Sequence, residues 1–330
     1  MKEKVLVVAS AGGHLTQAMC ATANCENIIL VSNKINLSDA RIKKAYKIMD
    51  TQHNAFIHII NLFFALYLLI KERPKAVFST GGPIVLPFAL LCKILPIKFV
   101  FLDTLSRVVE LSNTGKLLKR YHLYNAFFSQ WEAIAKSNNV DYIGKCFDIL
   151  GEHKDVKEPE YITLTDSPLV LVTIGTNQYS FPRALRAISQ MSLYSDERVQ
   201  WLIQAGDNQV DILPANGRVV TLVNRDEMES YVRKASLVIS HCGIGSINQM
   251  LSYKKKVIFI PRVARLSEFS DDHQLQIASQ LNNPKFDVIN PDEPLPDVSY
   301  EELSAEKLVK APVNITNYTV ANKIEEVLSL

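Results

Sequence analysis

The chain has 330 residues, of which 48% are hydrophobic and 21% are charged. This composition excludes a disordered, collagen-like or low-complexity protein, and the length predicts two domains. Residues 1–150 carry 18 Lys and Arg against 10 Asp and Glu, a net charge of +8, whereas residues 151–330 carry 18 against 24, a net charge of −6. The first half alone is therefore expected to face something negative, such as an anionic lipid leaflet or phosphates.

The first predicted element is a core strand at Val5–Ala9. Its apolar run is too short for a signal peptide and ends in Gly12-Gly13-His14. The five cysteines form neither a Cys-x-x-Cys pair nor a spacing that suits zinc, so scattered free thiols in a reducing compartment are expected. We therefore expect a cytoplasmic protein without a metal site.

Strand-like and helix-like patterns then alternate along both halves. The further predicted strands are Ile28–Ser32, Ala76–Ser79, Phe99–Leu102, Leu169–Ile174, Gln200–Gln204, Val219–Val223, Leu237–Ser240 and Val257–Ile260. The predicted helices are Ser38–Lys47, Asn54–Lys71, Arg183–Ser192, Asp226–Lys234, Ser246–Tyr253, Asp272–Leu281 and Ile315–Leu328. This rhythm predicts an α/β protein of two doubly wound, Rossmann-like domains. The polar stretch 151–168 is the expected linker, between a first domain at 1–150 and a second at 169–330.

One helical pattern, Ala55–Ile70, is almost wholly apolar. Its 16 residues are fewer than the ~20 that a membrane-spanning helix needs. Three alternatives stay open: a helix buried on both faces of an α/β domain, a helix whose outer face rests in the bilayer surface, and a transmembrane segment, which the short length disfavours. A second apolar run follows at Pro83–Ile97. The basic residues around the two runs suit a helix that rests in the bilayer surface: Lys71, Arg73, Lys75, Lys93 and Lys98.

Four loops that follow predicted strands contain glycine. They are Ser10–His14, Ser79–Pro83, Ile174–Asn177 and Ser240–Ser246. In doubly wound sheets ligands bind beyond the carboxyl ends of the strands, where glycine lets backbone N–H groups approach a phosphate. Neither a GxGxxG nor a GxxxxGK[ST] pattern is present, which argues against an NAD site or an ATP phosphate loop.

The second half carries a family resemblance. His241–Gln249 (HCGIGSINQ) resembles the donor-diphosphate loop of two-domain GT-B glycosyltransferases, and Lys256–Pro261 and Asp271–Ala278 continue the pattern. Together with Val172–Asn177, these motifs make residues 169–281 similar to the catalytic subunit of the eukaryotic dolichol-linked UDP-GlcNAc transferase.

The first half resembles the membrane-associated partner of that enzyme through Ser10–Gln17, Ser79–Gly82, Arg107–Lys116 and Tyr124–Glu132. Bacteria have the same pair, usually as two proteins, in capsule and exopolysaccharide assembly. This chain resembles the two subunits fused, and more distantly the bacterial transferase that adds GlcNAc to lipid I.

The resemblance implies a GT-B fold with an interdomain cleft. It also implies an inverting UDP-sugar-dependent hexosyltransferase that acts on a polyprenyl-diphosphate-linked saccharide, peripherally associated with the inner face of the cell membrane. Because no D-x-D motif is present, metal-independent chemistry without a cofactor is expected, and no nucleic-acid partner is expected. The implied donor-binding residues are Gly175, Thr176, Asn177, His241, Gly243, Gly245, Ser246, Gln249, His273 and Gln274. Related enzymes often have an acidic residue where Gln249 stands, so ribose binding here would depend on an amide.

His14 is the best candidate for the general base of an inverting transfer, because histidine titrates near neutral pH and this residue matches the family's histidine. A structural role in capping the next helix is the alternative. Asp103 and Glu110 are rival bases, and the resemblance places acceptor loops at Gly12, Gly13, Gly81 and Gly82. Two other functions compete with a transferase: a UDP-sugar 2-epimerase of the same architecture, and a non-catalytic membrane tether.

Overall fold

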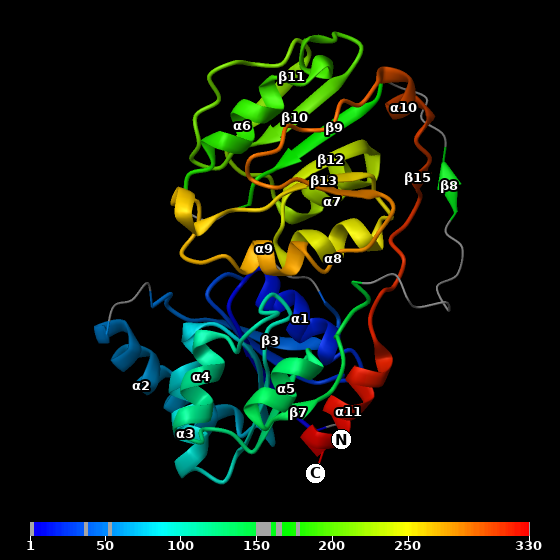
Figure 1. The fold of residues 1–330 in the computed structure, drawn as a ribbon. Helices are drawn as coiled ribbons and strands as arrows, with labels where there is room; N and C mark the ends of the chain where they lie inside the picture. The colour runs from blue at the N-terminus through cyan, green and yellow to red at the C-terminus, as the bar shows by residue number, and fades with distance from the viewer. Residues whose placement is uncertain are drawn as a thin grey trace. The chain divides into compact units, whose positions relative to one another are not determined.

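The computed structural model describes residues 3–35, 39–51, 55–149, 160–162, 167–175 and 179–329. The chain forms two compact units (Figure 1). Unit 1 comprises Met1–Asp148 together with Thr316–Leu330, and unit 2 comprises Ile149–Ile315.

Unit 1 is built on a seven-stranded parallel sheet with the order β3-β2-β1-β4-β5-β6-β7. Its strands are β1 (Val5–Ala9), β2 (Ile28–Ser32), β3 (Ile42–Lys47), β4 (Ala76–Gly81), β5 (Lys98–Leu102), β6 (Ala126–Ser129) and β7 (Asp141–Tyr142). Its helices are α1 (Gly13–Ala21), α2 (Ala55–Glu72), η1 (Pro83–Val85), α3 (Leu86–Ile94), α4 (Asn113–Arg120), α5 (Glu132–Asn138) and α11 (Tyr318–Ser329). Every residue of β1, β2 and β4 is buried, because helices cover both faces of the sheet.

Unit 2 repeats the plan with six parallel strands in the order β11-β10-β9-β12-β13-β14. These are β9 (Leu169–Thr173), β10 (Gln200–Gln204), β11 (Gly217–Val220), β12 (Ala235–His241), β13 (Val257–Ile260) and β14 (Phe286–Val288). Its helices are α6 (Pro182–Ser189), η2 (Ser192–Ser195), α7 (Arg225–Lys234), α8 (Ile244–Ser252), η3 (Ala264–Leu266), α9 (His273–Ala278) and α10 (Tyr300–Ala305). A short antiparallel pair, β8 (Tyr161–Ile162) and β15 (Leu308–Val309), stands apart from the main sheet.

The strand order of each sheet reverses at its first strand. In unit 1, β1 lies between β2 and β4, and in unit 2, β9 lies between β10 and β12. Connections therefore leave on opposite faces at these two points, which is where doubly wound sheets open a crevice for ligands. Each of the four glycine loops follows one of the strands at these points.

The prediction of a helix at Ser38–Lys47 is wrong where the structure describes it, because Ile42–Lys47 forms the edge strand β3. Alternate residues of this strand point the same way, and Lys44 and Tyr46 both reach the buried carboxylate of Glu72 on α2. The Lys44 Nζ lies 2.9 Å and the Tyr46 hydroxyl 2.6 Å from Glu72 oxygens. Lysines on an exposed edge strand also discourage pairing with other chains, and they gave this strand the charge pattern of a surface helix.

The last helix, α11, belongs to unit 1, so the predicted second domain at 169–330 does not extend to its end. Its buried side chains pack against α1, β4 and β5: Val320, Ala321, Ile324 and Leu328. Lys98 at the start of β5 donates to the carbonyl of Val327 at 2.8 Å, which satisfies an orphan acceptor at the helix end. Most of the expected linker lies outside the described residues, at 151–159 and 163–166.

The apolar helix α2 is not buried on both faces, so that alternative is wrong. One stripe of its large apolar side chains is between 38% and 67% exposed: Phe56, Ile59, Ile60, Phe63, Tyr67 and Ile70. On neighbouring α3, Leu90 and Ile94 are exposed as well. Among the described residues, no helix combines the length and the hydropathy that crossing a membrane requires.

Candidate active site

In unit 1 the loops after β1 and β4 approach each other so closely that only glycine fits. A Cβ on Gly82 would lie 2.0 Å from the Ser10 hydroxyl, and one on Gly81 would lie 2.9 Å from the His14 ring. Both glycines also have positive φ, at 98° and 118°. The predicted loop glycines Gly12 and Gly13 stand at the start of α1, with Gly12 as its N-cap at φ 90°.

His14 lies in the first turn of α1 with its ring held against β4. Its Nδ1 is 2.8 Å from the Thr80 carbonyl, and the Thr80 hydroxyl in turn donates to the His14 carbonyl at 2.6 Å. Because a carbonyl only accepts, Nδ1 carries the proton and Nε2 is the basic nitrogen of the neutral ring. This is the tautomer that a general base requires. The α1 N-cap is a glycine without a side-chain hydrogen bond, so the structure gives no support to a capping role for His14.

The two rival bases lie in different surroundings. The Asp103 carboxylate follows β5, is 3% exposed, and accepts hydrogen bonds from the Thr104 N–H at 3.0 Å and the Ser112 N–H at 2.9 Å. Burial raises the pKa of Asp103, while the bonds from Ser112 and Thr104 oppose the shift. Glu110 is half exposed and pairs with Lys116 at 2.6 Å and Arg107 at 3.7 Å. The bonded geometry of Asp103 is that of a residue that organises the loop leading into α4.

In unit 2 the ring of His241, the last residue of β12, lies between two glycines. A Cβ on Gly175, which follows β9, would come within 3.1 Å of the ring, and a Cβ on Gly243 would come within 2.5 Å. The His241 Nδ1 is 3.4 Å from the Thr173 carbonyl at the end of β9. The imidazole therefore joins the two strands on either side of the sheet's switch point.

His241 is neutral at physiological pH. Burial, with the nearby positive charge of Arg262, lowers the pKa of His241 to about 4, although the Thr173 carbonyl opposes the shift. A neutral ring with Nδ1 facing a carbonyl offers Nε2 as an acceptor. The side chain thus contributes shape and a hydrogen-bond acceptor here, without a charge.

Helix α8 begins directly behind Gly243. Its N-cap makes no side-chain hydrogen bond and its first turn contains no acidic residue. Within the described part of the chain, the N–H groups of Ile244, Gly245 and Ser246 find no acceptor. Gln249 lies three residues after Ser246, on the same partly exposed side of the helix. Such a helix start attracts an anion through its N–H groups and its dipole.

The segment that includes Gln274 is tied to the end of β13 by three consecutive N–H groups. The Arg262 N–H donates to the Gln274 Oε1 at 3.0 Å, and the Val263 N–H to the Glu268 carboxylate at 3.0 Å. The Ala264 N–H donates to Asp272 at 2.8 Å. Gln274 is only 2% exposed, and with its oxygen occupied it presents its amide donors.

His273, beside Gln274 in the first turn of α9, is held by Asp271. Its Nδ1 lies 2.5 Å from the Asp271 carboxylate, and its ring packs edge-on against Phe269 at 4.7 Å. As with His14, the acceptor on Nδ1 makes Nε2 the basic nitrogen of the neutral form. The structure thus gathers Gly175, His241, Gly243 and the Arg262–Gln274 segment at one edge of the sheet. Thr176 and Asn177 lie outside the described residues.

Comparison with known proteins matches both halves of the chain to families. Residues 5–146 match the family described as oligosaccharide biosynthesis protein Alg14 like. Residues 169–295 match the family described as glycosyltransferase family 28 C-terminal domain.

The relatives are transferases. A UDP-N-acetylglucosamine–N-acetylmuramyl-(pentapeptide) pyrophosphoryl-undecaprenol N-acetylglucosamine transferase from Prochlorococcus marinus is 23% identical over 97% of this chain and 91% of its own. The enzyme of the same name from the Wolbachia of Brugia malayi is 25% identical over 84% and 82%. Among solved structures, MurG of Acinetobacter baumannii aligns over 99% of this chain and 98% of its own, with a TM-score of 0.54 and 15% identity.

The chain is a hexosyltransferase with the GT-B fold. A putative UDP-N-acetylglucosamine 2-epimerase from Listeria monocytogenes has the same fold, with a TM-score of 0.57 over 97% of this chain and 95% of its own at 14% identity. The fold alone does not separate an epimerase from a transferase, whereas the family matches do.

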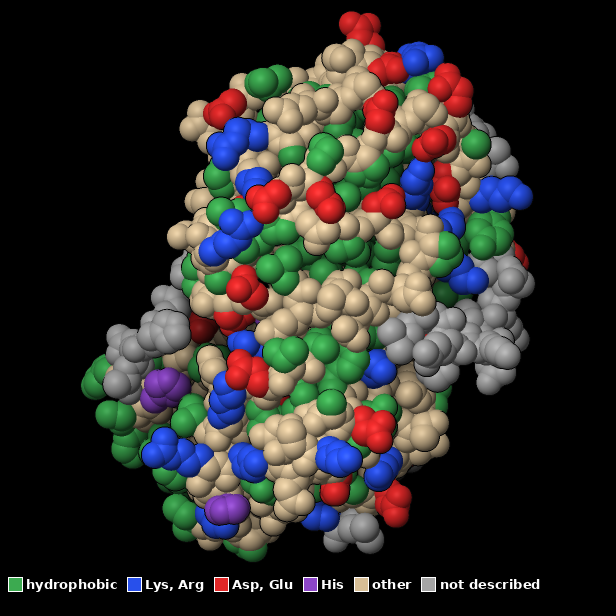
Figure 2. Space-filling view, viewed as in Figure 1, with side chains coloured by type: hydrophobic (Ala, Val, Ile, Leu, Met, Phe, Trp, Pro, Cys, Tyr) green, Lys and Arg blue, Asp and Glu red, His purple; other side chains and the backbone are tan. Residues whose placement is uncertain are grey.

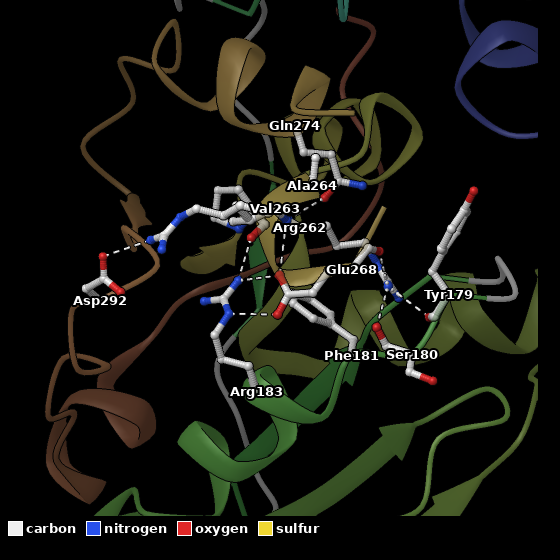
Figure 3. Close-up of polar contacts among 12 residues, drawn as sticks. Tyr179, Ser180, Phe181, Arg183, Arg262, Val263, Ala264, Glu268, Gln274 and Asp292 are labelled. Carbon is white, nitrogen blue, oxygen red and sulfur yellow. Dashed lines mark hydrogen bonds and ion pairs between the residues drawn. The ribbon is translucent and has the colours of Figure 1, made fainter. Parts of the chain in front are cut away.

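Three charged residues of this hexosyltransferase lie outside the motifs that the sequence offered. Arg262, Glu268 and Arg183 form a polar cluster around the end of β13 (Figure 3). The Arg183 guanidinium makes a two-point contact with the Glu268 carboxylate, at 2.8 Å for each bond. A signal was present, because Pro261-Arg262 puts a charge directly after a wholly apolar strand.

Unit 1 contains a cavity of about 330 Å³ that is lined by residues such as Cys92, Lys98 and Asn125. It lies at the amino-terminal end of β5, whereas the glycine loops of unit 1 follow the carboxyl ends of β1 and β4.

Proposed function

We propose that the protein transfers a sugar, with inversion, from a UDP-sugar to a polyprenyl-diphosphate-linked saccharide in capsule or exopolysaccharide biosynthesis. We infer that it is a fused counterpart of the two-subunit dolichol-linked UDP-GlcNAc transferase. The observation that carries the proposal is the pair of glycine-lined switch points, one with an oriented histidine and the other with an open helix N-terminus. The matches of the two halves to an Alg14-like family and to a glycosyltransferase C-terminal family support the fusion.

Unit 2 is assigned the donor. The N–H groups at the start of α8 suit the diphosphate, and Gln249 suits the ribose. His273 and the amide of Gln274 suit the sugar hydroxyls or phosphate, and Thr176 and Asn177 stay in the predicted donor set. The donor's diphosphate carries two negative charges and gains another on the oxygen released from the anomeric carbon as UDP leaves. Backbone donors and the helix dipole can offset this charge, so the reaction is proposed to need neither a metal ion nor a cofactor.

Unit 1 is assigned the acceptor and the base. His14 Nε2 takes the proton of the acceptor hydroxyl as its oxygen attacks the anomeric carbon, and Thr80 keeps the ring in the tautomer that can do so. The loops with Gly12, Gly13, Gly81 and Gly82 are proposed to line the acceptor's path. Asp103 and Glu110 rank behind His14, since one is occupied by loop N–H groups and the other pairs on the surface with basic side chains.

The decisive experiment uses the purified full chain and a short polyprenyl-diphosphate-linked monosaccharide. UDP-glucose, UDP-galactose, UDP-glucuronic acid and UDP-GlcNAc are offered in turn, with and without EDTA, and products are identified by mass and NMR. One donor is expected to give a disaccharide with inverted anomeric configuration and equal rates in both arms. An altered UDP-sugar formed without acceptor would support an epimerase, and no turnover would support a tether. Loss of activity in EDTA, restored by Mn²⁺, would overturn the metal-free mechanism.

We also propose that unit 1 rests on the cytoplasmic face of the membrane through α2 and α3. The exposed stripe of α2, including Phe56 and Phe63, continues onto Ile94 of α3. Hydrophobic side chains gather over α2 in the space-filling view (Figure 2). Such a stripe flanked by lysines suits the headgroup boundary of an anionic bilayer.

Flotation with vesicles tests this membrane surface. Changing both Phe56 and Phe63 to Ser is expected to lower binding to anionic vesicles about tenfold, because two aromatic side chains no longer leave water. Leu222→Ser is the matched control, since Leu222 is an equally exposed apolar residue of unit 2. Equal flotation of all three proteins would contradict the assignment.

A further inference from the structure

Arg262 is a fully buried cation at the end of β13 whose hydrogen bonds go to backbone carbonyls. Its side chain is 1% exposed. One guanidinium nitrogen, Nη1, donates to the carbonyls of Tyr179 and Glu268 at 2.9 Å and of Ser180 at 3.3 Å (Figure 3). The other, Nη2, donates to the carbonyl of Ile174 at 2.8 Å. One side chain therefore joins three segments of unit 2.

This arrangement is costly as a purely structural device. Burial lowers the pKa of Arg262 to about 10, and its Nε–H has no acceptor in the described part of the chain. The nearby carboxylate of Glu268 is bonded instead to Arg183 and to the Val263 N–H. The ring centroid of Phe181, 4.4 Å from the guanidinium carbon, adds a favourable contact, and the charge of the Glu268 carboxylate attracts the guanidinium from a longer distance. Apolar side chains of similar volume are often as stable in such places, so the charge calls for another explanation.

The bond to Ile174 determines which way the next N–H points. Because the peptide group is planar and trans, a carbonyl drawn toward Arg262 turns the Gly175 N–H to the opposite side. Within the described residues this N–H has no hydrogen-bond acceptor. Gly175 has φ +87° and lies against the His241 ring, next to the open start of α8. Arg262 thus aims a backbone donor at the edge where the diphosphate is proposed to bind.

The backbone of the same residue orients a second donor. The Arg262 N–H holds the Gln274 Oε1 at 3.0 Å, which fixes the amide of this buried side chain. The described residues provide no hydrogen-bond acceptor for the Gln274 Nε2. Because Gln274 is 2% exposed and its oxygen is occupied, the remaining polar atom is a donor suited to a ligand oxygen.

We propose that Arg262 is a positioning residue for donor binding, whose guanidinium fork turns the Gly175 N–H toward the diphosphate of a nucleoside diphosphate. The inference rests on the proposed function, since it assumes that unit 2 binds the donor. Arg262 is placed behind the ligand and not against it, because its side chain is 1% exposed and both of its Nη atoms donate to carbonyls of the protein. It acts through the peptide planes that it holds, which a lysine cannot do because an ammonium lacks the planar fork.

Comparing UDP with uridine tests the assignment, because only UDP carries the diphosphate. In the full chain, Arg262→Lys and Arg262→Met are expected to weaken UDP about tenfold by calorimetry, the effect of losing one hydrogen bond to a charged group. Uridine affinity, measured by ligand-observed NMR, is expected to change less than twofold. An equal loss of affinity for UDP and for uridine would show general distortion of unit 2 and would overturn the proposal. UDP affinities within twofold of the wild type would overturn it as well.

Arg183→Met is the matched control. It breaks the two-point contact with Glu268 in the same cluster but leaves the bond between Arg262 and Ile174 in place. UDP affinity is expected to stay within twofold. An equal loss in this variant would assign the effect to the whole cluster and overturn a specific role for Arg262. Failure of both Arg262 variants to fold would do the same, because the residue would then be required for the fold itself.

A measurement without ligand separates this proposal from the proposed function. In ¹H–¹⁵N spectra of the ligand-free chain, the Gly175 backbone amide and the Gln274 side-chain amide are expected to shift in Arg262→Lys and not in Arg183→Met. Absence of UDP binding by the wild type would overturn the proposed function, whatever the spectra show. If the wild type binds UDP but the two amides do not shift in Arg262→Lys, only the role of Arg262 would be overturned.

Discussion

Units 1 and 2 share a strand order but differ in what stands behind the reversal point of the sheet. Behind the loops of unit 1 lies a network of neutral amides, beside the buried carboxyl group of Asp103. The Gln17 Oε1 accepts from the Leu105 N–H at 2.7 Å and from Gln130 at 2.8 Å, and both glutamines are at most 1% exposed. The equivalent place in unit 2 holds the buried charge of Arg262, and beside it the buried carboxylate of Glu268 pairs with the partly exposed Arg183.

This difference suits the two proposed tasks. A general base must change its protonation state near neutral pH, and a fixed cation beside His14 would oppose that. A site for a diphosphate gains from fixed positive charge and from oriented N–H groups. The positive charge of Arg262 also helps to keep the nearby His241 neutral. The same scaffold thus carries different electrostatics in the two units, because the chemistry depends on the loops and their supports, not on the strand order.

The largest expected effect separates the two units by reaction step. His14→Ala should lower kcat by 10²–10⁴-fold, the usual loss for a general base, while UDP affinity stays within twofold because the donor is assigned to unit 2. Initial rates with the active donor and calorimetry with UDP measure the two quantities.

His241→Ala is the reciprocal variant, expected to weaken UDP binding. A His14→Ala enzyme that keeps more than about a tenth of the rate would move the base to another group, with Asp103→Asn and Glu110→Gln as the next variants. A His14→Ala chain with a collapsed melting temperature would instead favour a structural role.

The stability of unit 2 should rise in alkali because of Lys255. This side chain is 2% exposed, donates to the carbonyls of Arg233 and Ala235 at 2.9 and 2.8 Å, and has a pKa that burial lowers to about 7 from the ordinary 10.5. Between these values the unfolded chain binds a proton that the folded chain lacks. The free energy of unfolding therefore increases with pH across this window, by up to about 1.4 kcal/mol per pH unit, and levels off below pH 7.

Urea unfolding at several pH values measures this slope. Each unit contains one tryptophan, Trp131 in unit 1 and Trp201 in unit 2, so a Trp131→Phe background reports on unit 2. Lys255→Met should flatten the dependence. Parallel curves for the two proteins would show that Lys255 stays protonated in the folded state.

Unit 1 should respond at the acid end instead, through Glu72. Hydrogen bonds from Lys44 and Tyr46 lower the pKa of this carboxylate below the ordinary 4.5. Its contribution to stability is complete above about pH 4.5 and is lost as the pH falls through the lowered folded value. In a Trp201→Phe background, Glu72→Gln should reduce the acid dependence of unfolding. The same dependence in both proteins would assign the acid effect to other carboxylates.

The alternation of strands and helices, and the glycine loops at the two reversal points, could be predicted from the sequence. Buried parallel strands read as apolar runs, and glycines after them mark close backbone approach, as at Gly82 and Gly243. Edge strand β3 could not be predicted, because three of its six residues are lysines and it lacks the apolar run of a buried strand. The orienting partners were out of reach, since Thr80 meets His14 and Arg262 meets Ile174 only after distant segments pack.

A smaller effect is expected from a single methyl group at the donor edge. Gly243 has φ −91°, which alanine adopts freely, so Gly243→Ala acts only through the contact of its Cβ with the His241 ring, 2.5 Å away. UDP affinity should fall about tenfold, or 1.4 kcal/mol. In a His241→Ala background the same change should have almost no effect, because the ring is gone. Additive losses in the double variant would mean that Gly243 acts through the start of α8 instead.

The smallest expected effect tests the contrast in charge between the two halves. Each basic residue near an anionic surface strengthens binding by about fivefold, so Lys93→Gln on α3 should weaken binding to anionic vesicles by about that factor. Lys234→Gln at the end of α7 removes an exposed lysine from unit 2 and should leave binding unchanged. The difference should vanish on neutral vesicles and shrink in high salt, since screening shortens the reach of surface charge. If the two variants weaken binding equally, net charge and not the face of unit 1 governs the encounter with the membrane.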